Sequence, residues 1–275
     1  MRKVKTMAVL EEKYEALKKT LADYGKVGVA FSGGVDSPLL LETAHDVLKD
    51  NAVALTADLR SVPAFEMKEA VDFCASEGIR HIICEINELN LPEFVKNPPD
   101  RCYYCKANVL RQLQMAAEEL GITHIVEGTN LDDLGDYRPG RKAVLENGVV
   151  SPLLDAGLTK EEIRTLSARL GLPTWDKPSY ACLASRVPCG EPITEEKLRM
   201  VEKAEGYLME NGFRQVRVRV HGDMARIEVI PENIEKLAGA DFREKLTGKF
   251  NELGFRYVSL DLNGYKTGSM NLKGV

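Results

Sequence analysis

The sequence predicts an α/β protein with a parallel sheet covered by helices on both faces, followed by a smaller C-terminal α+β domain. Over the first two-thirds of the chain, short apolar runs alternate with helical patterns, which is typical of a parallel sheet. After a stretch rich in Pro, Gly and Cys at 178–192, the pattern changes to a long amphipathic helix and then to alternating strands. We therefore expect one domain at 1–178 and a second at 179–275.

The first domain should contain four buried strands joined by helices. The strands are expected at 27–31, 52–56, 81–84 and 124–127, where each run is short and apolar. The helices are expected at 37–48, 64–77, 104–120 and 159–170, where apolar residues recur at helical spacing. Thr159 and Glu162 form a capping-box pattern that marks the start of the last helix.

The second domain should begin with an amphipathic helix at 194–210, capped by Thr194. Apolar and charged residues alternate at 216–220 and 225–229, which predicts an antiparallel pair of strands across the turn at 221–223. Two short helices and a strand at 257–260 complete the domain. In the first of these strands Arg217 and Arg219 share one face, and on a small sheet that face can simply be solvated.

The composition is that of an ordinary globular protein. The 275 residues are 44% hydrophobic and 29% charged, with a net charge of -5, so the strong basic footprint of a general nucleic-acid binder is absent. No apolar run approaches the roughly 20 residues that span a bilayer, and the basic N-terminal residues are not followed by a signal-peptide core. We expect a cytoplasmic protein with no membrane or nucleic-acid partner.

A glycine-rich segment at 32–37 separates the first predicted strand from its helix. Gly33 and Gly34 let backbone N–H groups approach phosphate oxygens, and the helix N-terminus favours an anion. Ser32 and Ser37 can donate hydroxyl hydrogen bonds, whereas the carboxylate of Asp36 suits a Mg²⁺ ligand beside a polyphosphate. The alternative is an ordinary tight turn. A Walker A loop is excluded because its Gly-Lys-Ser/Thr ending is missing.

The six cysteines are of two kinds. Cys74 and Cys84 stand among apolar neighbours and are expected in the core. The other four lie in polar or Pro/Gly-flanked segments: Cys102, Cys105, Cys182 and Cys189. The first two of these form a C-x-x-C with basic flanks just before a predicted helix, which favours thiolates. A redox pair, half of a zinc site and iron–sulfur ligation all remain open from the residues alone.

The 32–37 segment closely resembles the signature of the pyrophosphate-loop superfamily of ATP pyrophosphatases. The resemblance implies an adenine nucleotide alpha hydrolase-like fold in which the loop holds the β- and γ-phosphates of ATP, the α-phosphorus is attacked and pyrophosphate leaves. Four further residues follow the second and fourth strands, where family members form the nucleotide pocket: Asp58, Arg60, Gly128 and Thr129.

Nearly the whole chain resembles the ATP-dependent sulfurtransferases that build the nickel-pincer nucleotide cofactor of lactate racemase. Besides the loop, the matching stretches are 136–140, 185–190, 216–219, 225–228 and 257–262. The resemblance implies adenylylation of a carboxylate of pyridinium-3,5-biscarboxylic acid mononucleotide, its conversion to a thiocarboxylate, and a homo-oligomer, a hexamer in relatives. The sulfide donor is unknown.

The cysteines select one type within this family. Members that sacrifice a cysteine's sulfur carry it immediately before the position of Cys182, where this chain has Ala181. The other type uses three cysteines to bind a [4Fe–4S] cluster that delivers exogenous sulfide, and Cys102, Cys105 and Cys182 match it. Cys189 is then expected to be a bystander.

The resemblance also implies roles for charged residues. Asp36, Cys182 and Arg186 are expected to be catalytic. Arg138 and Arg186 are expected to contact a substrate phosphate or carboxylate, because guanidinium groups suit both. The remaining set, expected to form an anion or metal site at a subunit junction, is Glu205, Arg217 and Glu228.

Three other functions remain possible. A tRNA thiolase of the same superfamily would predict a basic surface or zinc-knuckle pairs, and neither is visible. An ammonia-using adenylylating ligase would not need the three cysteines. A nucleotide- or metal-sensing protein would bind ATP without releasing pyrophosphate.

Overall fold

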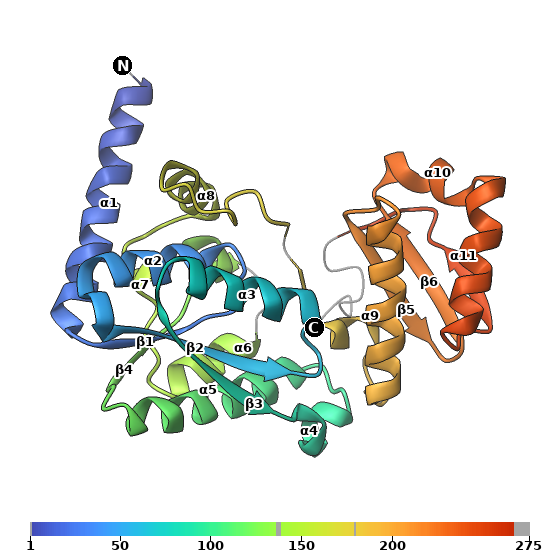
Figure 1. The fold of residues 1–275 in the computed structure, drawn as a ribbon, viewed down its shortest axis with the longest axis horizontal. Helices are drawn as coiled ribbons and strands as arrows, with labels where there is room; N and C mark the ends of the chain where they lie inside the picture. The colour runs from blue at the N-terminus through green and yellow to red at the C-terminus, as the bar shows by residue number, and fades with distance from the viewer. Residues whose placement is uncertain (1, 136–138, 179, 267–275) are drawn as a thin grey trace. The chain divides into compact units, whose positions relative to one another are not determined.

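The computed structural model describes residues 2–135, 139–178 and 180–266, and the chain divides into two compact units (Figure 1). The first unit comprises Met1–Ile86 and Cys102–Tyr180, and the second comprises Asn87–Arg101 and Ala181–Val275. The division after Tyr180 lies close to the boundary expected from the sequence. The segment 87–101, which the sequence analysis placed in the first domain, packs instead with the second unit.

The first unit is built on a parallel sheet of four strands. These are β1 (Val27–Ala30), β2 (Ala52–Leu59), β3 (Arg80–Ile86) and β4 (His124–Val126), in the order β3-β2-β1-β4. Every pairing in this sheet is parallel, as the sequence predicts. Because β2 lies on one side of β1 and β4 on the other, the strand order reverses at β1, which makes the carboxyl end of β1 a topological switch point.

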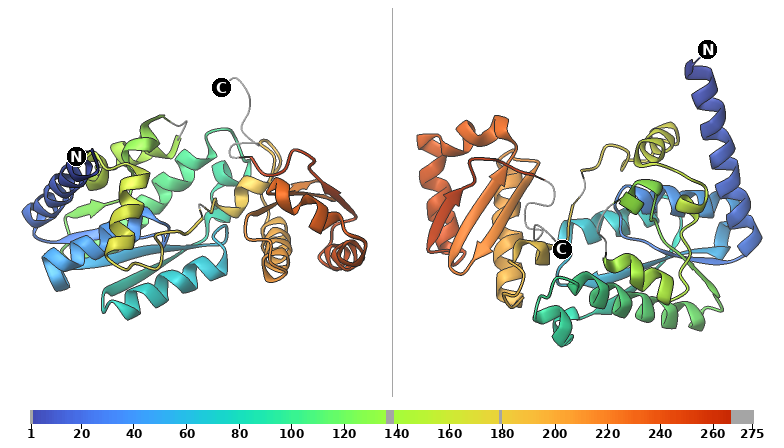
Figure 2. Two further views of the ribbon diagram at one scale, coloured as in Figure 1. Left: turned by 90° about the horizontal axis from the view of Figure 1, so that it is seen from above. Right: turned by 180° about the vertical axis from the view of Figure 1, so that it is seen from behind.

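Helices cover both faces of this sheet, as predicted (Figures 1 and 2). One face packs against α1 (Arg2–Tyr24), α2 (Asp36–Leu48), α3 (Ala64–Ser76), α7 (Pro152–Asp155) and α8 (Lys160–Arg169). The other face packs against α5 (Arg101–Glu119) and α6 (Pro139–Glu146). Each face therefore has its own apolar core. Ala54 of β2 belongs to the core that includes α1 and α2, and Leu55 belongs to the core that includes α5, so the strand is buried on both sides.

Several local predictions are confirmed. Thr159 and Glu162 form the complete capping box at the start of α8. Cys74 is buried in the core, and burial raises the pKa of its thiol to about 12. Cys84 is half-buried and packs against the apolar core on the α5 face of the sheet. The long helix α1 was not predicted, although Leu10, Leu17 and Leu21 recur at helical spacing and are buried.

The second unit is a small α+β domain. Its helix α9 (Glu195–Glu210) begins at Thr194, whose side chain accepts a hydrogen bond from the Lys197 N–H, as predicted. The strands β5 (Val216–His221) and β6 (Met224–Val229) pair antiparallel, and β7 (Tyr257–Leu260) joins β6 in parallel. The remaining helices of this unit are α4 (Pro92–Val95), α10 (Ile234–Ala238) and α11 (Ala240–Glu252).

Five short 3₁₀ turns are also found in the described residues: Lys49–Asn51, Glu88–Asn90, Leu131–Gly135, Leu183–Arg186 and Pro231–Asn233. Within the described part of the chain, none of the helices has the length and apolar character needed to cross a bilayer.

The packing of β1 against β2 leads to a prediction about stability. A Cβ added at Gly28 would lie 2.6 Å from Cδ1 of Leu55, which is fully buried, so Gly28→Ala forces the close-packed core to shift. We expect a loss of about 1–3 kcal/mol in the free energy of unfolding, measured by urea titration. Gly248→Ala is the control because its Cβ meets nothing within 4 Å in α11, and it should leave stability unchanged or raise it by up to about 1 kcal/mol.

Candidate active site

The candidate site lies at the edge of the sheet where the parallel strands end. The loop after β1 stands between the segments that follow β2 and β4, because β1 is hydrogen-bonded to both strands. Ligands of open α/β sheets bind at this kind of switch point. The structure therefore brings the predicted phosphate loop to the position where the fold itself favours a ligand.

The phosphate loop, 32–37, is closed by its own hydroxyl groups. The Ser32 N–H donates to Oγ of Ser37 at 3.2 Å, and the two hydroxyl oxygens are also 3.2 Å apart. Gly33 has a φ of +66°, a left-handed conformation that favours glycine. Helix α2 begins at Asp36, and the preceding Val35 provides no side-chain cap. The backbone N–H groups at this helix start are thus suited to an anionic ligand.

Asp36 is held between two polar side chains. Nζ of Lys160 lies 2.5 Å from its Oδ2, and Nδ2 of Asn130 donates to its Oδ1 at 3.3 Å. Burial raises the pKa of Asp36, and this effect outweighs the opposing attraction of Lys160. The described residues hold no group of three or more His, Cys, Asp or Glu side chains arranged for a metal. A single carboxylate nevertheless fits Mg²⁺, which commonly binds one or two carboxylates and completes its shell with phosphates and water.

The segment after β4 packs tightly against the phosphate loop. A Cβ at Gly128 would lie 3.1 Å from Cβ of Asp36 and 3.2 Å from the Ser37 nitrogen, so only glycine fits without displacing the loop. The next residue, Thr129, donates its backbone N–H to Oε1 of Glu127 at 3.0 Å. Gly128 and Thr129 therefore lie beside the phosphate loop, and their contact with a nucleotide stays a prediction.

The other predicted nucleotide residues follow β2 or end it. Asp58 is the penultimate residue of β2 and Arg60 follows the strand, and both are exposed. They stand at the same edge of the sheet as the phosphate loop because β2 is the parallel neighbour of β1.

Two lysines at this site were not found from the sequence. Lys160 pairs with Asp36, and Nζ of Lys177 lies 2.8 Å from the Gly33 carbonyl oxygen and 2.6 Å from a carboxylate oxygen of Glu69. Both lysines are more than 120 residues from the loop in sequence, so no local pattern identifies them. Their ammonium groups place positive charge beside the loop, which favours a polyphosphate.

The C-x-x-C motif lies inside a helix rather than before it. The sequence predicts a helix from about residue 104, but α5 begins at Arg101. Cys102 and Cys105 are therefore three residues apart in its first turns and share one face. Cys102 is exposed and Cys105 is half-buried.

Helix α5 connects β3 to the parallel strand β4, so it runs back across the sheet and begins at the edge where the strands end. Lys106, the next residue after Cys105, has its Nζ 3.8 Å from Oε2 of the buried Glu127 at the end of β4. The two thiols of the first unit are therefore at the same edge of the sheet as the phosphate loop.

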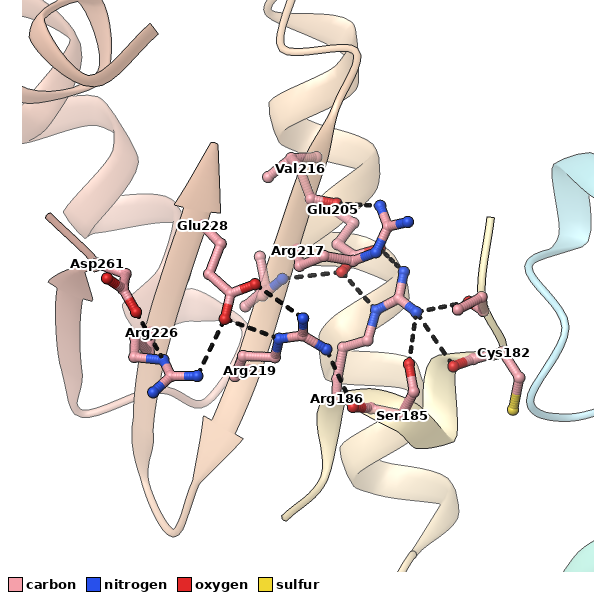
Figure 3. Close-up of polar contacts among 12 residues, drawn as sticks. Cys182, Ser185, Arg186, Glu205, Val216, Arg217, Arg219, Arg226, Glu228 and Asp261 are labelled. Atoms are coloured by element: carbon pink, nitrogen blue, oxygen red, sulfur yellow. Dashed lines mark hydrogen bonds and ion pairs between the residues drawn. The ribbon is translucent and has the colours of Figure 1, made fainter. Parts of the chain in front are cut away.

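The second unit contains a buried network of arginines and glutamates (Figure 3). Nε and Nη2 of Arg186 donate to the two carboxylate oxygens of Glu205, each at 2.8 Å. Arg219 binds Glu228 in the same two-pronged way, at 3.1 and 2.8 Å. Bidentate pairs of this kind are strong and directional.

The arginine face of β5 is not solvated. Arg217 is 3% exposed and Arg219 is 5% exposed, so the solvated-face alternative of the sequence analysis is wrong. The physical reason is that acidic side chains from α9 and β6 meet this face and compensate the buried charge. Arg217 donates to the Val216 carbonyl oxygen at 2.7 Å and lies over the Tyr265 ring. Burial, together with nearby Arg186, lowers the pKa of Arg217.

The remaining residues that the sequence singles out differ in how exposed they are and in what they bind. Arg186, which is expected to contact substrate, is 1% exposed and binds Glu205 and the Ala181 carbonyl oxygen. Cys182 is half-buried at the start of the turn that contains Arg186. Cys189 is exposed and its thiol donates to the Asn97 carbonyl oxygen. Arg138 lies outside the described residues.

The fold and the phosphate loop define the class of protein: an ATP-dependent enzyme of the pyrophosphate-loop superfamily, with an adenine nucleotide alpha hydrolase-like fold. No protein-family model matches the chain. It is 44% identical over 263 residues to an uncharacterised protein of Synechocystis sp., covering 96% of this chain and 98% of that protein.

A second relative gives the family. Over 266 residues the chain is 37% identical to the pyridinium-3,5-bisthiocarboxylic acid mononucleotide synthase of Lactiplantibacillus plantarum, covering 96% of both proteins. A GMP synthase of Aeropyrum pernix is 28% identical over 220 residues, which are 74% of this chain and 42% of that enzyme. The chain belongs to the family of the pyridinium-3,5-bisthiocarboxylic acid mononucleotide synthase, and it is an ATP-dependent enzyme related to this synthase and to GMP synthase.

The environment of Asp36 leads to a second prediction. Because burial raises the pKa of this carboxyl, the native state binds its proton more tightly than the unfolded chain does. Wild-type stability should therefore fall, relative to Asp36→Asn, as pH rises from the ordinary pKa of Asp through the raised one. Above that window the difference should stay constant. Urea titrations of both proteins at several pH values measure this difference in the free energy of unfolding.

The same variant should lose activity without losing stability. We expect ATP-dependent pyrophosphate release to fall on the order of a hundredfold in Asp36→Asn, since an amide cannot replace a carboxylate beside Mg²⁺. Asp46→Asn, which removes an exposed carboxylate paired with Lys49, is the matched control and should change neither quantity. Equal activity in Asp36→Asn and wild type would exclude a role for the Asp36 charge.

Proposed function

We propose that the chain is a cytoplasmic ATP-dependent sulfurtransferase that adenylylates a carboxylate of pyridinium-3,5-biscarboxylic acid mononucleotide and converts it to a thiocarboxylate with sulfide carried on a [4Fe–4S] cluster. One observation carries the proposal: the phosphate loop and the thiols of Cys102 and Cys105 lie at the same edge of one sheet. The relative that covers 96% of the chain is named for a bisthiocarboxylic product, which supports sulfur as the transferred atom.

The first half-reaction uses the phosphate loop. The N–H groups at the start of α2 and the ammonium groups of Lys160 and Lys177 would bind the β- and γ-phosphates, and Asp36 would hold Mg²⁺. A carboxylate oxygen of the substrate attacks the α-phosphorus, the bond to the bridging oxygen breaks, and pyrophosphate leaves. The product is an acyl-adenylate, in which AMP replaces a poor leaving group with a good one.

The second half-reaction uses the cysteines. Three thiolates suit a [4Fe–4S] cluster and leave one iron for a non-protein ligand, so the donor set Cys102, Cys105 and Cys182 fits the group chemically. When bound, the cluster would supply sulfide in deprotonated form at neutral pH. Sulfide attacks the acyl carbon and AMP leaves. Because residue 181 is alanine, no cysteine stands at the position from which other family members give up their own sulfur.

The substrate is an anion with a phosphate and two carboxylates. We propose that Arg217, with Glu205 and Glu228, and Arg138 take part in its recognition. The surroundings of Arg217 support this for the second unit, because its guanidinium is buried near those of Arg186 and Arg219, whose positive charges favour an anion. Guanidinium groups match phosphate and carboxylate geometry.

The decisive experiment is anaerobic reconstitution with iron and sulfide, followed by reaction with Mg²⁺, ATP and the dicarboxylate mononucleotide. The expected result is a brown protein that binds iron and releases pyrophosphate and AMP, and a product in which sulfur replaces oxygen, identified by mass spectrometry. A colourless protein that binds one zinc contradicts the cluster. An amide product formed with ammonium and no sulfide would instead identify an ammonia-using ligase.

Substitution of Cys182 separates the two half-reactions. In Cys182→Ala we expect pyrophosphate release in the first turnover to stay within about twofold of wild type, because the phosphate loop belongs to the other unit. Thiocarboxylate formation should fall by about a hundredfold or more. Cys189→Ser, which changes an exposed thiol of the same unit, is the control and should retain both steps. Undiminished sulfur transfer in Cys182→Ala would rule out a role for its thiol.

A further inference from the structure

The backbone around Cys182 is held by arginine side chains. Between residues 181 and 185, four carbonyl oxygens accept hydrogen bonds from guanidinium groups: those of Ala181, Cys182, Ala184 and Ser185. The donors are Arg101, Arg186 and Arg219, which we call the arginine clamp. All three donors and all four acceptors belong to the second unit.

Arg186 is the centre of the clamp. Its Nη1 donates to the carbonyl oxygens of Ala181 at 2.5 Å and Cys182 at 3.1 Å, and to Oγ of Ser185 at 2.9 Å. The opposite edge of the same guanidinium is fixed by both carboxylate oxygens of Glu205. Glu205 itself accepts the Val218 N–H at 2.8 Å, so the clamp is tied to α9 and β5.

The other two arginines hold the end of the turn. Nη1 of Arg101 donates to the Ala184 carbonyl oxygen at 3.1 Å and is anchored by Oδ1 of Asn97 at 2.6 Å. Nη1 of Arg219 donates to the Ser185 carbonyl oxygen at 3.1 Å and is anchored by Glu228. Each guanidinium thus binds both a side chain that anchors it and a carbonyl oxygen of the turn.

We propose that the arginine clamp is a positioning device for the Cys182 thiol. The clamp donates to four backbone oxygens and one hydroxyl of the turn, and Figure 3 shows the Cys182 sulfur directed away from the guanidinium groups. The half-buried thiol thus points away from the clamp while its backbone is fixed, as a ligand or sulfur-handling group requires. The role in sulfur transfer rests on the proposed function, whereas the positioning of the thiol does not.

The test uses Arg186→Lys in the full chain. An ammonium cannot bind both oxygens of Glu205 and the turn carbonyls together, so the turn should loosen. Hydrogen exchange of the peptide containing residues 181–187 should quicken about tenfold or more, and alkylation of Cys182 by iodoacetamide about threefold or more. In the reconstituted enzyme, sulfur transfer should fall about tenfold or more while first-turnover pyrophosphate release stays within about twofold.

The control is Arg226→Lys, which weakens another arginine contact to Glu228 in the same sheet without touching the turn. It should leave exchange in 181–187 and Cys182 alkylation unchanged. If Arg186→Lys does not fold, Ser185→Ala removes one acceptor of Nη1 and should change both rates in the same direction by about twofold. Unchanged exchange and alkylation in the folded variant overturn the clamp. Absence of sulfur transfer in wild type overturns only the proposed function, since both rates are measured without it.

Discussion

The position of β1 inside a parallel sheet is the constraint on which the nucleotide-binding unit depends. Because β1 is bonded to β2 and to β4, the loops that leave these three strands must share one edge. The approach of Gly128 to Asp36 and Ser37 is close, since a Cβ there would lie 3.1 Å from Cβ of Asp36 and force its neighbours to shift. Helix α2 starts at this edge because it follows β1. Helix α5 also starts there, because it returns the chain from the end of β3 to the beginning of the parallel strand β4. The strand order thus brings the backbone N–H groups at the start of α2 and two thiols to the same edge of the sheet.

Electrostatics at this edge follow from the same crowding. Burial disfavours the charged form of Asp36, yet Lys160 reaches it at 2.5 Å, so the carboxylate exists in a balance between desolvation and ion pairing. Lys177 adds a second ammonium group at the loop, bound to the Gly33 carbonyl oxygen. A polyphosphate with its Mg²⁺ would offer new partners to all three groups, which is a reason for a partly buried site to hold charges of both signs.

The parts of the fold that follow from local chemistry could be predicted from the sequence. Buried parallel strands are continuous apolar runs, and the capping box of Thr159 and Glu162 is a short-range signal. Contacts between distant segments could not be predicted. Lys160 and Lys177 carry no local sign of their contacts with the loop, and the segment 87–101 looks like any connection between a strand and a helix.

The strand β5 shows why a local pattern can also mislead. Alternating Val and Arg is the pattern of a strand with one wet face, but the arginine face is buried because Glu205 and Glu228 arrive from α9 and β6. Long-range charge pairing of this kind leaves no periodic signal in the strand itself. By contrast, the leucines of α1 recur at helical spacing and are buried, so the sequence does contain a signal for this helix.

The three thiols are positioned by two different physical means. Cys102 and Cys105 take their spacing from helical geometry, in which the backbone carbonyls are satisfied within the helix. Cys182 stands in a short turn where the Cys182 and Ala184 carbonyl oxygens accept backbone N–H groups, and arginine side chains donate to these oxygens and to two others. Buried ion pairs such as Arg186–Glu205 are costly to desolvate, and apolar residues of similar volume often stabilise a protein equally well. Stability alone therefore does not explain charged groups at this turn. The guanidinium groups fix carbonyl oxygens on both sides of Cys182, and a fixed backbone limits the orientations of its thiol.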